Sequence, residues 1–160
     1  MMVRLLVLIL TLGFPVTAFS QTCVESADDY LEVQDHGHNY RADVIVDYIA
    51  NIDQRDLYNS SGTRLTNFAA ILQQDRANLH KSGQLDGFGN LTDTWDTYFA
   101  TPARRAQLSS ATYFGGCWGS AQEFSRLKDG IENGRVGGVL WVVLFRQSNG
   151  HPGVYISGVN

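Results

Sequence analysis

The sequence predicts an α+β protein in which four or five helices pack on a small C-terminal antiparallel sheet or hairpin. Two observations lead to this class. Apolar residues recur at helical spacing in several segments between residues 40 and 132. Near the C-terminus, an unbroken apolar run, 139–145, is followed by a turn and a second apolar stretch, 154–156, which is the pattern of a hairpin.

The composition limits the class of protein further. The chain has 160 residues, of which 44% are hydrophobic and 18% charged, and its net charge is −4. This apolar content excludes intrinsic disorder. The acidic balance argues against nucleic-acid binding, which would normally need a basic excess. A chain of this length can bury one cooperative core, so we expect residues 21–160 to form a single domain.

Residues 1–20 have the layout of a secretory signal peptide. Arg4 precedes an apolar stretch, Leu5–Leu12, and the small residues Ala18 and Ser20 stand at the −3 and −1 positions of a cleavage site. The stretch is about half the roughly 20 residues that a membrane-spanning helix needs. We therefore expect cleavage before Gln21, export to the periplasm or the exterior, and no stable membrane insertion afterwards.

Cys23 and Cys117 are the two cysteines of the chain, and both remain after that cleavage. An even pair in an oxidising compartment predicts a disulfide. Two buried thiols and a reactive cysteine are the alternatives. The bridge would tie the N-terminal end to a glycine-rich segment, 115–119. The triplets that begin at Asn59 and Asn90 are glycosylation sequons, which would matter only in a eukaryotic host.

The N-terminal half is expected to be mainly helical. The polar segment 23–39 holds at most a short helix or strand at 28–33. Ile45, Tyr48, Ile49 and Ile52 then stand at helical spacing, which favours a helix over 40–53, although the β-branched run 44–46 would suit a strand equally well.

The clearest helix is expected over residues 64–81, opened by Thr63 and stopped by Gly83. One face of this helix is apolar except for a single arginine. Its members are Leu65, Phe68, Ala69, Leu72, Arg76 and Leu79. Leu72 on this face and Val143 on the apolar run 139–145 should both be deeply buried.

The second half is expected to hold short helices and then the hairpin. Residues 93–100 predict a short helix, and Thr101 with Pro102 starts another. A capping box at 120–123 begins a helix that ends at Asn133 and Gly134. The run 139–145 predicts a strand buried on both faces, and 154–156 its returning partner.

His36 and His38 form the first candidate site. In an extended backbone both imidazoles point to one side, and they can bind a transition metal if a third ligand arrives. His80 and Asp75 are the donors we expect for that purpose. A solvated polar loop is the alternative.

Arg76 is the second candidate. A guanidinium on an inward face indicates either a buried ion pair with Asp75 or carbonyls, or a clamp for a carboxylate or phosphate ligand. Either role requires acceptors within hydrogen-bond distance, because an uncompensated buried charge costs too much free energy.

No motif for nucleophilic catalysis, phosphate binding or cofactor binding is present in the sequence. We therefore expect an exported, non-catalytic binding or envelope module that needs no cofactor. Its partner would be a protein or a small anionic ligand held by Arg76 and Asp75. The alternatives are a small metal-dependent hydrolase that uses His36, His38 and His80, and a purely structural envelope component.

Overall fold

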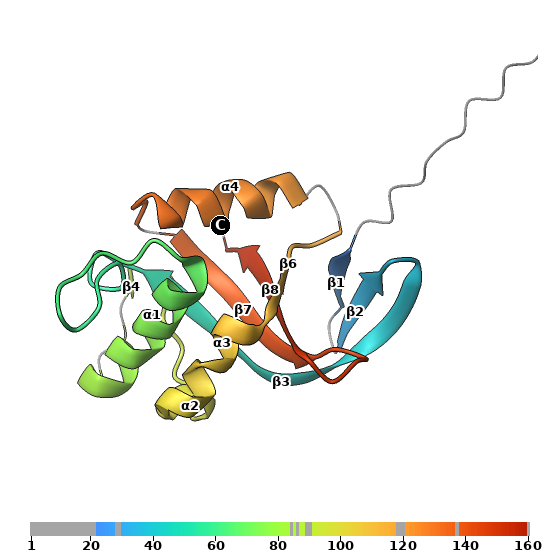
Figure 1. The fold of residues 1–160 in the computed structure, drawn as a ribbon, viewed down its shortest axis with the longest axis horizontal. Coiled ribbons are helices and arrows are strands. Elements are labelled where there is room, and N and C mark those ends of the chain that lie inside the picture. Colours follow the sequence, from blue (N-terminus) through green and yellow to red (C-terminus); the bar gives the residue numbers. More distant parts are fainter. Residues whose placement is uncertain are drawn as a thin grey trace, which may run out of the picture.

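The computed structural model describes residues 22–27, 30–83, 85, 87–88, 91–117, 121–136 and 138–159, so the predicted signal peptide lies outside the described residues. The chain forms a curled six-stranded sheet with helices beside it (Figure 1). Its strands are β1 (Cys23–Ala27), β2 (Tyr30–Asp35), β3 (His38–Ile52), β6 (Thr112–Phe114), β7 (Gly138–Arg146) and β8 (Pro152–Gly158). The helices are α1 (Phe68–Ser82), α2 (Pro102–Arg105), α3 (Gln107–Ser110), α4 (Ala121–Glu132) and the 3₁₀ turn η1 (Tyr98–Ala100).

The order of strands in the sheet is β1-β2-β3-β7-β8-β6. All neighbours are antiparallel except β6, which runs parallel to β8. A separate two-stranded hairpin joins β4 (Gly87–Phe88) to β5 (Leu91–Thr92). The predicted fold class is therefore wrong: the sheet dominates the molecule, and helices do not cover a small C-terminal hairpin.

The main error concerns residues 40–53, which are not a helix. They belong to β3, a strand of 15 residues. Ile45 and Ile49, which suggested helical spacing, are only half-buried, whereas Tyr48, Ala50 and Ile52 are buried in strict alternation. Pairing with β7 decides the conformation, because β-branched residues fit a pleated surface that has a long partner.

The core consists of two clusters on opposite faces of the sheet, and a β-bulge in β3 changes the face to which the residues of this strand point. The register with β7 shifts between Val44 and Val46, so residues before and after the bulge face opposite sides. Tyr48, Ala50 and Ile52 face the helices, in a cluster with Phe68 and Leu72 of α1 and alternate residues of β7 and β8. Ala42 faces the other cluster, whose members come from β1, β2, β3, β6, β7 and β8 and so lie inside the curl of the sheet.

β7 confirms the prediction of a strand with core contacts on both faces. Leu140, Val142 and Leu144 belong to the cluster on the helix side. Val143 and Phe145 belong to the cluster inside the curl. The returning strand β8 is also as predicted, paired with β7 from Leu140–Gly158 to Arg146–Pro152.

α1 begins later than predicted and ends where expected. Asn67, not Thr63, caps the helix, because its side chain accepts a hydrogen bond of 3.1 Å from the Ala70 N–H. Gly83 ends the helix in the left-handed conformation at φ 66°, as its position after the last turn predicts.

The shorter helices agree with the sequence in part. Thr101 caps α2 as predicted, and α4 ends before Asn133 and Gly134. The predicted helix over 93–100 is wrong, since only Tyr98–Ala100 forms a 3₁₀ turn. Asp93 instead accepts a hydrogen bond from the Asn51 N–H, which holds this segment beside β3, and Asp96 accepts one from the Phe99 N–H at the 3₁₀ turn.

The two edges of the curled sheet meet at the disulfide. Cys23 and Cys117 are bonded, as predicted, with their Cα atoms 5.0 Å apart. Next to the bond, the Val24 N–H donates to the Gly115 carbonyl at 3.0 Å, and the Cys117 N–H donates to the Val24 carbonyl at 3.1 Å. These contacts connect β1, at one end of the strand order, to the segment that follows β6 at the other end.

The burial of Leu72 sets a test of the helix-side core. Leu72 and Val143 are 0% and 1% exposed, as predicted. We expect Leu72→Ala to lower the free energy of unfolding by about 2–5 kcal/mol, because it removes methyl groups from a filled core. Urea unfolding measures this, with the exposed Lys81→Ala as the control that should change stability by less than about 0.5 kcal/mol. A similar effect of both substitutions would contradict the packing of α1.

Candidate functional site

Arg76 lies at the centre of a buried polar network. Its side chain is completely buried between α1 and β3. The Nε atom lies 2.7 Å from Asp75 Oδ2, Nη2 lies 3.2 Å from Asp93 Oδ1, and Nη1 lies 3.3 Å from Asp96 Oδ2. The prediction that carboxylates or carbonyls surround this guanidinium is therefore confirmed.

Backbone carbonyls complete the set of acceptors. Nη1 also donates to the Thr94 carbonyl at 2.9 Å, and Nη2 donates to the Ile49 carbonyl at 3.4 Å. A guanidinium has five N–H donors, and each has an acceptor here. The Tyr48 ring lies beneath the guanidinium, 4.2 Å from its carbon to the ring centroid. Arg76 thus connects α1, β3 and the segment 93–96, and no donor remains for a ligand.

The network holds more carboxylates than cations. Burial raises the pKa of Asp75 to about 8 against the lowering effect of Arg76, and the Asp93 and Asp56 carboxylates raise it further. Burial also raises the pKa of Asp56 to about 6, although this carboxylate accepts hydrogen bonds from the Asp53 N–H and the Asn78 amide. In the folded protein both groups therefore keep their protons to a higher pH than a free aspartate does.

These shifts predict that stability falls as pH rises. Unfolded aspartate loses its proton near pH 3.8, whereas folded Asp56 and Asp75 keep theirs to about pH 6 and 8. Between pH 3.8 and 8 the folded protein therefore binds more protons than the unfolded chain. The stabilisation that these protons provide is fully present below pH 3.8 and is lost as pH rises to 8. Burial lowers the pKa of His80, which acts in the opposite direction. We expect the free energy of unfolding to decrease by several kcal/mol between pH 5 and 8.

Urea unfolding across this pH range measures the effect. In Asp75→Asn the amide oxygen can still accept from Arg76 but cannot titrate, so its profile should be flatter between pH 6 and 8 than that of the wild type. Asp129→Asn, on the exposed face of α4, should keep the wild-type profile. A wild-type stability that rises over this range would contradict the protonated state of Asp75.

The three histidines of the metal hypothesis do not form a cluster. His36 lies in the turn between β2 and β3 with φ 47°, and His38 begins β3. His80 lies on α1, on the opposite side of the molecule (Figure 1), where its ring packs edge-on against Trp95. Within the described part of the chain, no group of three or more His, Cys, Asp or Glu side chains is placed to hold a metal ion.

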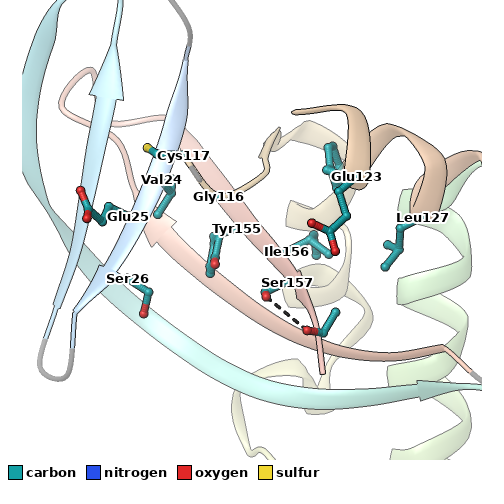
Figure 2. A pocket seen from close by; sticks show the side chains of 12 residues that line it. Val24, Glu25, Ser26, Gly116, Cys117, Glu123, Leu127, Tyr155, Ile156 and Ser157 are labelled. Carbon is teal, nitrogen blue, oxygen red and sulfur yellow. Dashed lines mark hydrogen bonds between the residues drawn. The ribbon is translucent and has the colours of Figure 1, made fainter. Parts of the chain in front are cut away.

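A groove lies where the sheet opens next to the disulfide. It has a volume of about 330 Å³ and is bounded by β1, β8, α4 and the segment after β6 (Figure 2). Its lining residues are Val24, Glu25, Ser26, Gly116, Cys117, Glu123, Phe124, Leu127, Tyr155, Ile156, Ser157 and Gly158. This volume falls within the range of small-ligand pockets, about 300–1,000 Å³.

The pairing of β6 explains why the groove exists. β6 is paired with β8 only from Thr112–Gly153 to Phe114–Tyr155. The chain after Phe114 then turns to β1, where it bonds to Val24. The remainder of β8, 156–158, therefore has no described strand on its outer edge, and α4 forms the wall above it.

The lining of the groove combines apolar side chains with negative charge. Val24, Phe124, Leu127 and Ile156 supply apolar surface, and Glu123 supplies a carboxylate. Among the described residues, no Lys, Arg or His belongs to the lining. Figure 2 shows the Glu123 side chain extending from α4 towards β8. The expected ligand charge is thus the opposite of the one that Arg76 suggested.

Sequence reasoning did not identify this groove. The predicted bridge to the glycine-rich segment 115–119 located one wall, to which Gly116 and Cys117 contribute. The other walls come from β1, at the start of the described chain, and β8, near its end. Only the closing contacts of the sheet bring these strands together, and no local pattern in the sequence encodes them.

Comparison with protein-family models, with curated proteins and with solved structures finds no match for this chain. No helix in the described residues is both long enough and apolar enough to cross a membrane. The groove is therefore interpreted from its own geometry.

Proposed function

We propose that this protein is an exported binding module whose ligand site is the groove between β1, β8 and α4. The observation that carries the proposal is the open outer edge of β8 beside a lining that combines apolar side chains with carboxylates. The Cys23–Cys117 disulfide supports export, because such bonds persist in oxidising compartments. The metal-dependent hydrolase has no comparable support, since its three histidines lie apart.

Export and the bridge are tested by intact-mass measurement of the secreted protein. We expect a chain that begins at Gln21 and has a mass about two units below that of the fully reduced chain, because the disulfide removes two hydrogens. A secreted chain that retains residues 1–20, or two free thiols in native material, would contradict the proposal of an exported, disulfide-closed module.

The ligand site is tested by filling it. A Cβ at Gly158 would lie 3.6 Å from Leu127 Cδ1, which is an ordinary contact, so Gly158→Val should fold while placing methyl groups between β8 and α4. We expect small-molecule fragments that shift the amide signals of Gly116, Ser157 and Gly158 to lose binding to this variant.

Gly138→Val is the matched control, because its Cβ would lie 3.9 Å from Ile131 Cδ1, outside the residues that line the groove. This variant should bind the same fragments as the wild type. Fragments that bind only outside the groove, or that bind Gly158→Val unchanged, would overturn the assignment of the site.

A further inference from the structure

Beyond its pairing with β6, the outer edge of β8 directs backbone groups to the groove, and no strand of the described chain pairs with them. Two hydrogen bonds flank the β7–β8 ladder, from the Gln147 N–H to the His151 carbonyl and from the Val159 N–H to the Val139 carbonyl. Odd-numbered residues of β8 therefore point their backbone groups at β7, and even-numbered residues point theirs at the other edge. β6 occupies that edge only as far as Tyr155, so Gly158 lies beyond the pairing.

β1, on the opposite wall of the groove, also directs backbone polar groups to the groove. Val24 directs both its N–H and its carbonyl to the segment 115–117, so Ser26, two residues further along β1, directs its backbone groups to the same side. Ser26 lies beyond the single bridge between Val24 and Gly116. The groove is thus bordered by the edges of two strands that run in the same direction, with backbone polar groups on both.

We propose that the groove binds an extended segment of a partner polypeptide, which adds as a strand to β8 and places a basic side chain at Glu123. This inference rests on the proposed function and names the class of ligand. A peptide backbone supplies alternating donors and acceptors, which match an unpaired sheet edge. The Ser157 hydroxyl now donates to the Gly158 carbonyl at 3.4 Å, a long bond that an incoming amide would replace.

Side-chain chemistry determines the sequence preference of the segment. Alternate side chains of a strand point to opposite faces. Those on the α4 side would contact Leu127 and Phe124 and reach the Glu123 carboxylate, which is exposed. Because Glu123 carries a carboxylate and the described lining residues include no cation, a lysine or arginine is favoured at this position, and an acidic residue is disfavoured.

The test titrates the isotope-labelled, oxidised secreted protein with four probes, observed through its amide signals. The first is a blocked hexapeptide of alternating threonine and valine with one central lysine. The second has glutamate in place of lysine. The third is the lysine peptide with alternate amides N-methylated, and the fourth is arginine amide, a cation without a strand.

The lysine peptide should shift the signals of Gly116, Ser157 and Gly158 and bind about tenfold more tightly than its N-methylated form, which cannot donate to the sheet edge. Exchanging lysine for glutamate should weaken binding about fivefold, as should Glu123→Gln tested with the lysine peptide. Asp129→Asn, a carboxylate of α4 outside the groove, should leave the affinity unchanged.

Three outcomes would overturn this inference alone. Equal binding of the N-methylated and unmethylated peptides would show that no strand forms. Binding of arginine amide in the groove with no added affinity for the lysine peptide would leave the ligand site in place but make its ligand a small cation. Concentration-dependent dimerisation through this edge, insensitive to the peptide, would make a second copy of the chain the occupant. If neither peptides nor fragments shift the groove signals, the proposed function fails as well.

Discussion

Arg76→Met is expected to lower the free energy of unfolding by about 3–5 kcal/mol, because it removes the guanidinium from three buried acidic side chains that accept its hydrogen bonds. Asp75, Asp93 and Asp96 all lie within 3.3 Å of Arg76 nitrogen atoms, and all are buried. Methionine fills much of the space but donates no hydrogen bond. Urea unfolding at pH 7 measures the loss.

Two further variants make this result interpretable. Arg104→Met removes an exposed arginine that packs on the Tyr98 ring, and it should cost less than about 1 kcal/mol. Arg76→Lys keeps the charge with fewer donors, so its stability should lie between those of the wild type and Arg76→Met, even if the methionine variant does not fold. Unchanged stability in Arg76→Met would indicate a residue kept for a ligand, not for the fold.

Removing the disulfide is the second large effect. Cys23 and Cys117 are 94 residues apart in sequence, so the bond closes a loop that holds most of the domain. The double variant Cys23→Ser with Cys117→Ser should lose about 4–5 kcal/mol in the chain-entropy description, less if the reduced chain keeps residual structure. Denaturant unfolding of the two proteins measures the difference.

Reduction provides the control for this experiment. A reducing agent should lower the stability of the wild type towards that of the double variant and leave the double variant unchanged. Amide exchange should accelerate first at Val24 and Cys117, whose hydrogen bonds join the two edges of the sheet beside the bond. A loss below about 1 kcal/mol would mean that the hydrogen bonds alone keep the edges together.

Local signals in the sequence determined the elements that depend on their own residues. The face of α1 and its stop at Gly83, the cap at Thr101, and the β7–β8 hairpin follow from spacing, capping and turn chemistry within a few residues. The pairing of the two cysteines followed from their even number in a chain that is predicted to be exported. That Arg76 needs carboxylate or carbonyl acceptors also followed from the sequence, because a charge on an apolar face must be compensated.

The identity of most of those acceptors was not predictable. Asp75 adjoins Arg76, but Asp93 and Asp96 reach it from a segment that was predicted to be helical. They lie there because this segment runs extended along β3, where Thr94 donates from its N–H to the Ile49 carbonyl and accepts from the Ile49 N–H on its hydroxyl. Such hydrogen bonds between distant segments leave no periodic trace in the sequence.

Tertiary structure alone decided the conformation of residues 40–53 and the position of the groove. Residues 45–52 satisfy helical and extended spacing about equally, and the long partner strand β7 with the bulge at Val44–Val46 selects the strand. The sheet can then curl until β1 meets the chain after β6, and the groove is the part of that junction that stays unpaired. The sequence by itself therefore determined which residues of each segment can be buried and which can cap a helix. The pairing of distant strands decided where two open edges face each other, because backbone hydrogen bonds between strands do not depend on side-chain identity.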